Sequence, residues 1–190
     1  MQFKSVDQAV SWAFRICGVP VLKGSSVFSM IPSSGRNPSD LTNHDKHGQA
    51  ALILSMIDRL ADQNQKAWIV AQHGKVFNTR DWSEANASDE QKAAIYTAKA
   101  VEDQLVQAVM AAMPTGVHNR RGFSKLIRNY FGAGIGVNAI KADLKCGYNA
   151  VQEWKDRVYT ALDRIADNID VTLEAEMVKQ GLIENNEQYA

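Results

Sequence analysis

The chain is poor in cysteine and has no long apolar run. Cys17 and Cys146 are its only thiols, and no C-x-x-C pair is present, so a structural zinc site is not expected. No apolar run approaches the roughly 18 residues that can span a membrane. The first residues also lack the basic segment and apolar core of a signal peptide. We therefore expect a cytoplasmic protein without membrane association, whose two thiols stay reduced.

Strand-like alternation of apolar and polar residues is also missing. Apolar residues instead recur at three- and four-residue steps, which is the pattern of amphipathic helices. The strongest of these patterns cover about residues 45–60, 89–113 and 148–180. Ser88, followed three residues later by Gln91, forms a capping box that predicts the start of the second of these helices. The sequence therefore predicts an all-α fold.

The net charge is zero, but the charges are unevenly distributed. Residues 1–114 carry 11 basic and 11 acidic side chains, residues 115–165 carry nine and four, and residues 166–190 carry one and six. A local basic surplus is what a phosphate-contacting surface requires. The alternative is a chance excursion in a chain of mixed charge.

The basic segment contains two helical patterns separated by a tight turn. After a helix over about residues 123–131 and a glycine-rich turn, a helix ends at Leu144. The residues Lys145-Cys146-Gly147 follow, and a long helix starts near Tyr148. The apolar residues that flank the turn predict a seam buried between the two helices: Val137, Ile140, Leu144, Val151, Trp154 and Val158. The outer face of the second helix would then be free to enter the major groove of B-DNA. Helix-turn-helix sequences often place glycine directly after the first helix, where this chain has Lys145.

This pattern predicts two domains and a set of DNA-contacting residues. Residues 1–114 would form a helical scaffold or partner domain. Residues 115–190 would form a helix-turn-helix domain with a long C-terminal helix and an acidic tail. The candidates for reading base edges are Tyr148, Asn149, Gln152, Glu153 and Lys155. The candidates for contacting phosphates are Arg120, Arg121, Lys125, Arg128, Lys141 and Lys145. The alternative for each single residue is a solvated or capping side chain.

Residues 137–165 resemble the helix-turn-helix module of the fourth region of sigma factors. The resemblance rests on the eleven-residue step from Ile140 to Val151, with Leu144 between them. The preceding segment, residues 47–74, is similar in arrangement to the helical hairpin of phage Q-type antitermination proteins. The resemblance implies a phage or prophage transcription regulator in the cytoplasm of a bacterial host cell. It would act on double-stranded DNA together with RNA polymerase, in antitermination of late genes. The long final helix is a candidate for homodimerisation, since operators are often symmetric.

Other functions leave weaker signals. A packaging or structural protein similar to a small terminase subunit also carries a helix-turn-helix, usually nearer the N-terminus. His44, His47 and His73 suggest a metal site, but surface or capping roles explain them better, so no metal is expected. The glycines at 132, 134 and 136 lack the strand and the Lys-Ser or Lys-Thr of a phosphate loop, so a turn is expected. No convergent acid–base or nucleophile set is present, so neither enzymatic activity nor a cofactor is expected.

Overall fold

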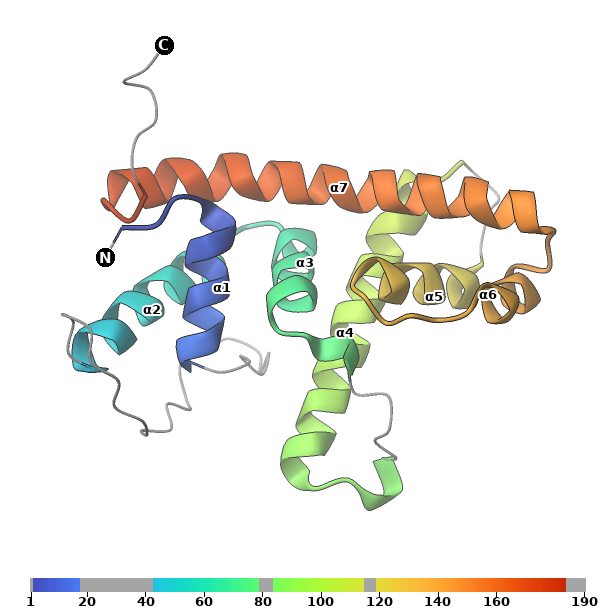
Figure 1. Ribbon diagram of the computed structural model, residues 1–190, viewed down its shortest axis with the longest axis horizontal. Coiled ribbons are helices and arrows are strands. Elements are labelled where there is room, and N and C mark those ends of the chain that lie inside the picture. The colour runs from blue at the N-terminus through green and yellow to red at the C-terminus, as the bar shows by residue number, and fades with distance from the viewer. Residues whose placement is uncertain (1, 18–42, 79–83, 115–118, 184–190) are drawn as a thin grey trace, which may run out of the picture. The chain divides into compact units, whose positions relative to one another are not determined.

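The computed structural model of the chain describes residues 2–17, 43–78, 84–114 and 119–183 (Figure 1). The all-α prediction is confirmed, because these residues form α-helices and two short 3-10 helices, and their one β pairing is a single bridge between Phe3 and Ile183. The α-helices are α1 (Val6–Cys17), α2 (Asn43–Asp58), α3 (Gln63–His73), α4 (Asp89–Ala112), α5 (Arg120–Tyr130), α6 (Val137–Leu144) and α7 (Tyr148–Lys179). The 3-10 helices are η1 (Val76–Asn78) and η2 (Glu84–Asn86).

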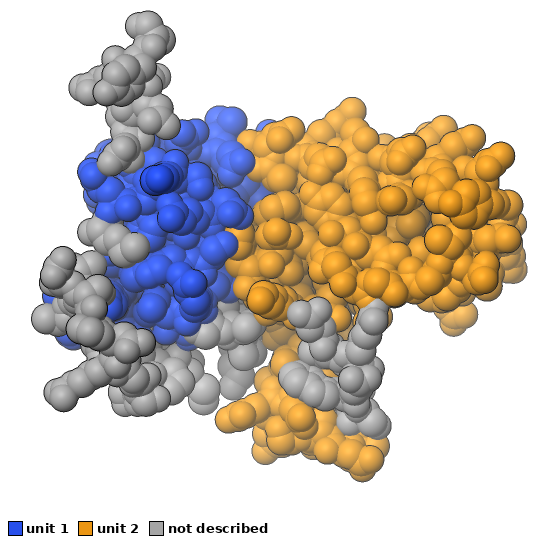
Figure 2. All heavy atoms as spheres, viewed as in Figure 1, with its two compact units in different colours: residues 1–61, 168–190 blue, residues 62–167 orange. Residues whose placement is uncertain are grey.

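The chain divides into two compact units (Figure 2). Unit 1 comprises residues 1–61 and 168–190, and unit 2 comprises residues 62–167. Helix α7 contributes its residues 148–167 to unit 2 and the remainder to unit 1.

Unit 1 is built on the packing of α1 against α2. The buried face of α1 includes Val10 and Phe14, and α2 buries Ile53 and Ile57. Phe3, just before α1, contacts Trp12 with the ring centres 5.3 Å apart and the ring planes tilted by 54°. The amide of Phe3 donates to the carbonyl of Leu182, so a backbone hydrogen bond joins the two segments of the chain that make up this unit.

Unit 2 is assembled around α4, which packs against α3 on one side and α5 on another, while α5 also packs against α6. Helix α4 starts where the sequence predicts. The amide of Gln91 donates to the hydroxyl of Ser88, and the amide of Ser88 donates to the side-chain carbonyl of Gln91. These two bonds satisfy amides that the first turn of a helix leaves without partners.

The division into units differs from the boundary expected after residue 114. Helices α3 and α4 belong with α5 and α6, because α4 packs directly on α5. The two halves of the expected hairpin also separate, since α2 packs on α1 in unit 1 whereas α3 packs on α4 in unit 2. Most of the acidic tail, residues 184–190, lies outside the described residues.

Among the helices that the structure describes, none combines the length and the apolar character needed to cross a membrane.

Candidate nucleic-acid interface

The turn between α6 and α7 has the three residues that the sequence predicts. Helix α6 ends at Leu144, and Lys145 then adopts left-handed backbone angles, with φ 53° and ψ 40°. Cys146 and Gly147 follow, and α7 begins at Tyr148. A left-handed residue directly after a helix is a common way for the chain to leave it, and glycine usually occupies that position. Here a lysine takes it, at a cost in backbone strain.

The apolar residues flanking this turn are only partly buried as expected. Ile140 and Val151 are each 2 % exposed and Val158 is fully buried, but Val137 is 37 % exposed. Leu144 is half-buried and packs against Gly122 of α5. The ring of Trp154 also contacts α5, with its centre 5.6 Å from that of Phe123. The expectation of a seam shared by α6 and α7 alone is therefore corrected. Helix α5 receives apolar side chains from both helices.

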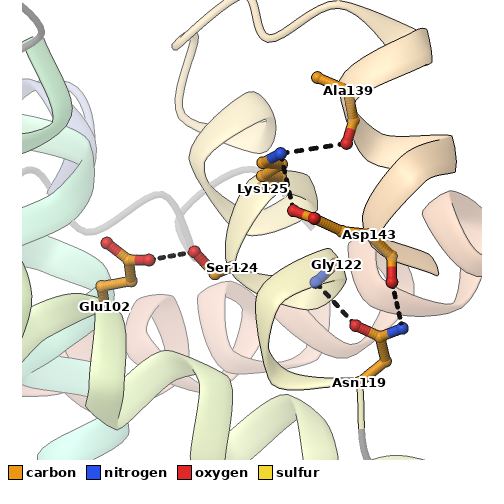
Figure 3. A network of polar contacts seen from close by, with 7 residues as sticks. All are labelled: Glu102, Asn119, Gly122, Ser124, Lys125, Ala139 and Asp143. Carbon is orange, nitrogen blue, oxygen red and sulfur yellow. Dashed lines mark hydrogen bonds and ion pairs between the residues drawn. The ribbon is translucent and has the colours of Figure 1, made fainter.

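A polar network fixes α5 to α6 (Figure 3). The ammonium of Lys125 lies 2.6 Å from a carboxylate oxygen of Asp143 and donates to the carbonyl of Ala139 at 3.0 Å. The side chain of Asn119 accepts from the amide of Gly122 and donates to the carbonyl of Asp143. Three of these contacts, the two of Lys125 and the one from Asn119 to Asp143, join α5 and its N-cap to α6, so α6 is held by directional bonds as well as by packing.

Helix α5 is tied to α4 in the same way. The hydroxyl of Ser124 donates to the carboxylate of Glu102 (Figure 3), and the guanidinium of Arg120 pairs with the carboxylate of Asp103. Together with the contacts to α6, these bonds place α5 between its two neighbours as a fixed support for the α6–α7 turn.

Aromatic contacts hold the end of α5 on α7 and α3. The phenol of Tyr130 donates to Asp163 of α7 at 2.7 Å, and its ring meets that of Tyr159 edge-on, with centres 5.1 Å apart. Phe131 contacts Trp68 of α3 at 5.9 Å between ring centres. Burial raises the pKa of the Tyr130 phenol well above its usual value, and the hydrogen bond to Asp163 adds to this rise.

The base-reading candidates fall into two groups. Tyr148 is 57 % exposed, and Asn149 and Glu153 are also exposed. Gln152 and Lys155 are half-buried and line a cavity in unit 2. Of the five side chains predicted to enter a DNA groove, three are thus exposed to solvent and two are only half-exposed.

The phosphate candidates divide by whether a carboxylate already pairs with them. Arg120 pairs with Asp103 and Lys125 with Asp143, so these two charges are neutralised within the chain. Arg121 and Lys145 are exposed and Lys141 is half-buried. No ion pair joins any of these three to another described residue.

Arg128 is half-buried, and its Nε is buried without a hydrogen-bond partner among the described residues. It therefore presents less of its charge to solvent than Arg121 or Lys145.

Three structurally important residues were not among the sequence candidates. Gly122 allows Leu144 to approach α5, and Asn119 caps α5 while bonding to α6. Asn129 holds the glycine-rich turn, because its side chain bonds to both the amide and the carbonyl of Ile135. The sequence signal for Asn119 and Asn129 was an asparagine just before a helix or a glycine-rich turn, where the short side-chain amide can form hydrogen bonds to nearby backbone groups.

The glycine-rich segment is a turn, as expected, with Gly132 at φ 85° and Gly134 at φ 61°. Within the described residues, no group of three or more His, Cys, Asp or Glu side chains is arranged to hold a metal ion.

Comparison of the chain with protein-family models, curated proteins and solved structures gave no match.

Proposed function

We propose that unit 2 binds double-stranded DNA in a sequence-dependent manner, through the turn at residues 145–147 and the first turns of α7. The observation that carries this proposal is the contrast around the start of α7. Val151 is buried on one face, whereas Asn149 and Glu153 are exposed on the opposite face and Tyr148 is exposed at the first position of the helix. The major groove of B-DNA accepts one helix, and the first residues of a recognition helix are those that contact base edges.

The exposed side chains have suitable chemistry for this role. The amide of Asn149 can pair with adenine through two hydrogen bonds, and the carboxylate of Glu153 can accept from the amino group of cytosine. Both residues lie on the same face of α7, because four residues correspond to about one helical turn. The N-terminus of a long helix also attracts phosphate through its free amides and its dipole.

The charges near the proposed contact are of both signs. Arg121, Lys141 and Lys145 supply positive charge that no described carboxylate neutralises. Further along the face of Asn149, at seven-residue steps, stand the exposed carboxylates of Asp156 and Asp163. The exposed Arg157 and Arg164 lie on the same side of α7, so the later turns of this face carry both signs of charge.

The resemblance to sigma-factor and Q-type modules supports a narrower role. We propose a phage or prophage transcription regulator that acts on promoter DNA with RNA polymerase as its partner, in antitermination of late genes. A homodimer would match a symmetric operator.

The test is selection of bound DNA from a random pool by the full chain, repeated at two salt concentrations. We expect an enriched sequence. Glu153→Ala should change it, whereas Glu174→Ala, the same exposed substitution further along α7, should not. Arg121→Gln should weaken binding to all sequences and reduce the salt slope by about one.

Two outcomes would contradict the proposal. A steep salt dependence without any enriched sequence would mean binding to the backbone only. No binding to DNA would refute it altogether. Light scattering on the same protein separates a monomer or dimer from a large ring, and a ring would favour a packaging function.

A further inference from the structure

Unit 2 contains a cavity that neither the fold nor DNA binding requires. Its volume is about 340 Å³, at the small end of the range for ligand-binding sites. It lies between α5, the glycine-rich turn, the start of α6 and the first turns of α7. The lining residues are Leu126, Asn129, Gly132, Gly134, Val137, Ile140, Val151, Gln152, Lys155 and Tyr159.

The walls of the cavity are mainly apolar. Leu126, Ile140 and Val151 are buried, while Val137 is exposed and stands at the rim. The cavity is partly open to solvent, so a small molecule could enter it and cover this apolar surface.

The polar groups of the cavity are few, and one of them is a cation without a counter-charge. The ammonium of Lys155 lies 5.2 Å from the centre of the Tyr159 ring, and no ion pair joins it to a described carboxylate. The amide of Gln152 stands on the same wall. Burial raises the pKa of the Tyr159 phenol further above its usual value. The side chain of Asn129 already bonds at both ends to Ile135.

We propose that this cavity binds a small organic acid, with its apolar body against Leu126, Ile140 and Val151 and its carboxylate on Lys155. An apolar pocket with a few convergent polar groups is the usual form of a small-molecule site. Charge-assisted hydrogen bonds from an ammonium to a carboxylate are among the stronger polar contacts in proteins. The volume equals roughly that of ten water molecules, which suits an acid with a single ring or a short branched chain.

Binding there would also regulate the proposed DNA contact, a consequence that rests on the proposed function. The acid would touch α5, α6 and α7 together and would hold Gln152 and Lys155 away from the groove-facing side of α7. If the acid binds the free protein and the DNA-bound protein with different affinities, it changes the affinity of the protein for DNA by the same factor.

The experiment uses the full chain and three acids: phenylacetate, 4-methylpentanoate and benzoate. Isothermal titration and the thermal midpoint report binding without DNA. We expect at least one acid to bind, and its neutral amide to bind at least about tenfold more weakly. Lys155→Met should lose this preference for the acid, and Val137→Trp should block the rim while keeping the helical circular dichroism spectrum.

Lys99→Met is the matched control. The ammonium of Lys99 lies 5.6 Å from the centre of the Tyr96 ring on α4, in the same kind of contact as Lys155 but outside the cavity lining. Its substitution should leave acid binding unchanged. The inference is overturned if no acid binds at millimolar concentration, if acid and amide bind equally, or if Lys99→Met weakens binding as much as Lys155→Met. Acid binding without DNA binding would support this inference and refute the proposed function. DNA binding without acid binding would support the proposed function and refute this inference.

Discussion

Gly122 is the position at which the packing of α5 against α6 can be tested most directly. A methyl group added there would lie 2.7 Å from Cγ of Leu144, closer still to one of its methyl carbons, and 3.0 Å from the side-chain oxygen of Asn119. Such overpacking costs about 1–3 kcal/mol. The higher helix propensity of alanine returns up to about 1 kcal/mol. We therefore predict that Gly122→Ala lowers the free energy of unfolding by up to about 2 kcal/mol.

A double-mutant cycle separates this clash from other effects. Leu144→Ala alone should cost about 1–3 kcal/mol, below the range for fully buried leucines because Leu144 is half-buried. In the double variant, the space vacated by Leu144 accepts the new methyl group. The double variant should therefore be no less stable than Leu144→Ala, which corresponds to a coupling of about 1–3 kcal/mol.

The measurement is urea denaturation followed by circular dichroism, with the slope checked for constancy. Gly48→Ala in α2 is the control, because a methyl group there meets nothing within 4 Å, and it should stabilise the protein by about 0.5–1 kcal/mol. Single effects at Gly122 and Leu144 that add to within about 0.5 kcal/mol would refute the contact. So would a stabilising Gly122→Ala.

Three further predictions concern strain, pairing and pH. Lys145→Gly and Lys75→Gly should each raise the free energy of unfolding by about 0.5–1 kcal/mol, because both lysines have φ near 50°. Only Lys145→Gly should also weaken DNA binding in a fluorescence titration. Lys125→Met and Asp143→Asn should each cost about 1–2 kcal/mol in urea denaturation, and the double variant should cost less than their sum. Stability should fall as pH rises above about 10, since the folded chain retains the Tyr130 proton that the unfolded chain releases. Tyr130→Phe should reduce that fall in thermal denaturation, and an unchanged pH profile would contradict the assignment.

Local signals in the sequence predicted local structure well. The capping box at Ser88 and Gln91 located the start of α4, and the residues 145–147 located the turn before α7. Both signals depend on hydrogen bonds or backbone angles within a few residues, which the local sequence specifies.

The packing partner of each apolar face could not be predicted. Periodicity shows that Leu144 and Trp154 face inward, but it does not say which helix they meet. The choice depends on Gly122 and Phe123, which lie in α5 and well before both residues in sequence. We expected Leu144 of α6 to pack on α7 and Trp154 of α7 to pack on α6, because these two helices are adjacent in the chain.

The count of charges located a basic segment but did not predict which of its side chains are free to contact phosphates. The surplus over residues 115–165 suggested that Arg120 and Lys125 were available to phosphates, yet each pairs with a carboxylate 17 or 18 positions away. A count of charges carries no information on such pairs. Among the phosphate candidates, apart from the half-buried Arg128, only Arg121, Lys141 and Lys145 have no carboxylate partner in the described part of the chain, which makes the proposed phosphate contact smaller than the sequence suggested.

The helical phase of α7 explains why its candidate residues divide. Successive residues turn by about 100°, so Asn149 and Glu153 share one face and Lys155 shares the face of Val151, while Gln152 lies between the two faces. Val151 is buried, and the side chains flanking it are therefore drawn towards the cavity instead of towards solvent. One short stretch of α7 can then serve two ligands through different side chains. An acid in the cavity would act on DNA binding by holding Gln152 and Lys155 away from the groove, without covering Asn149 or Glu153.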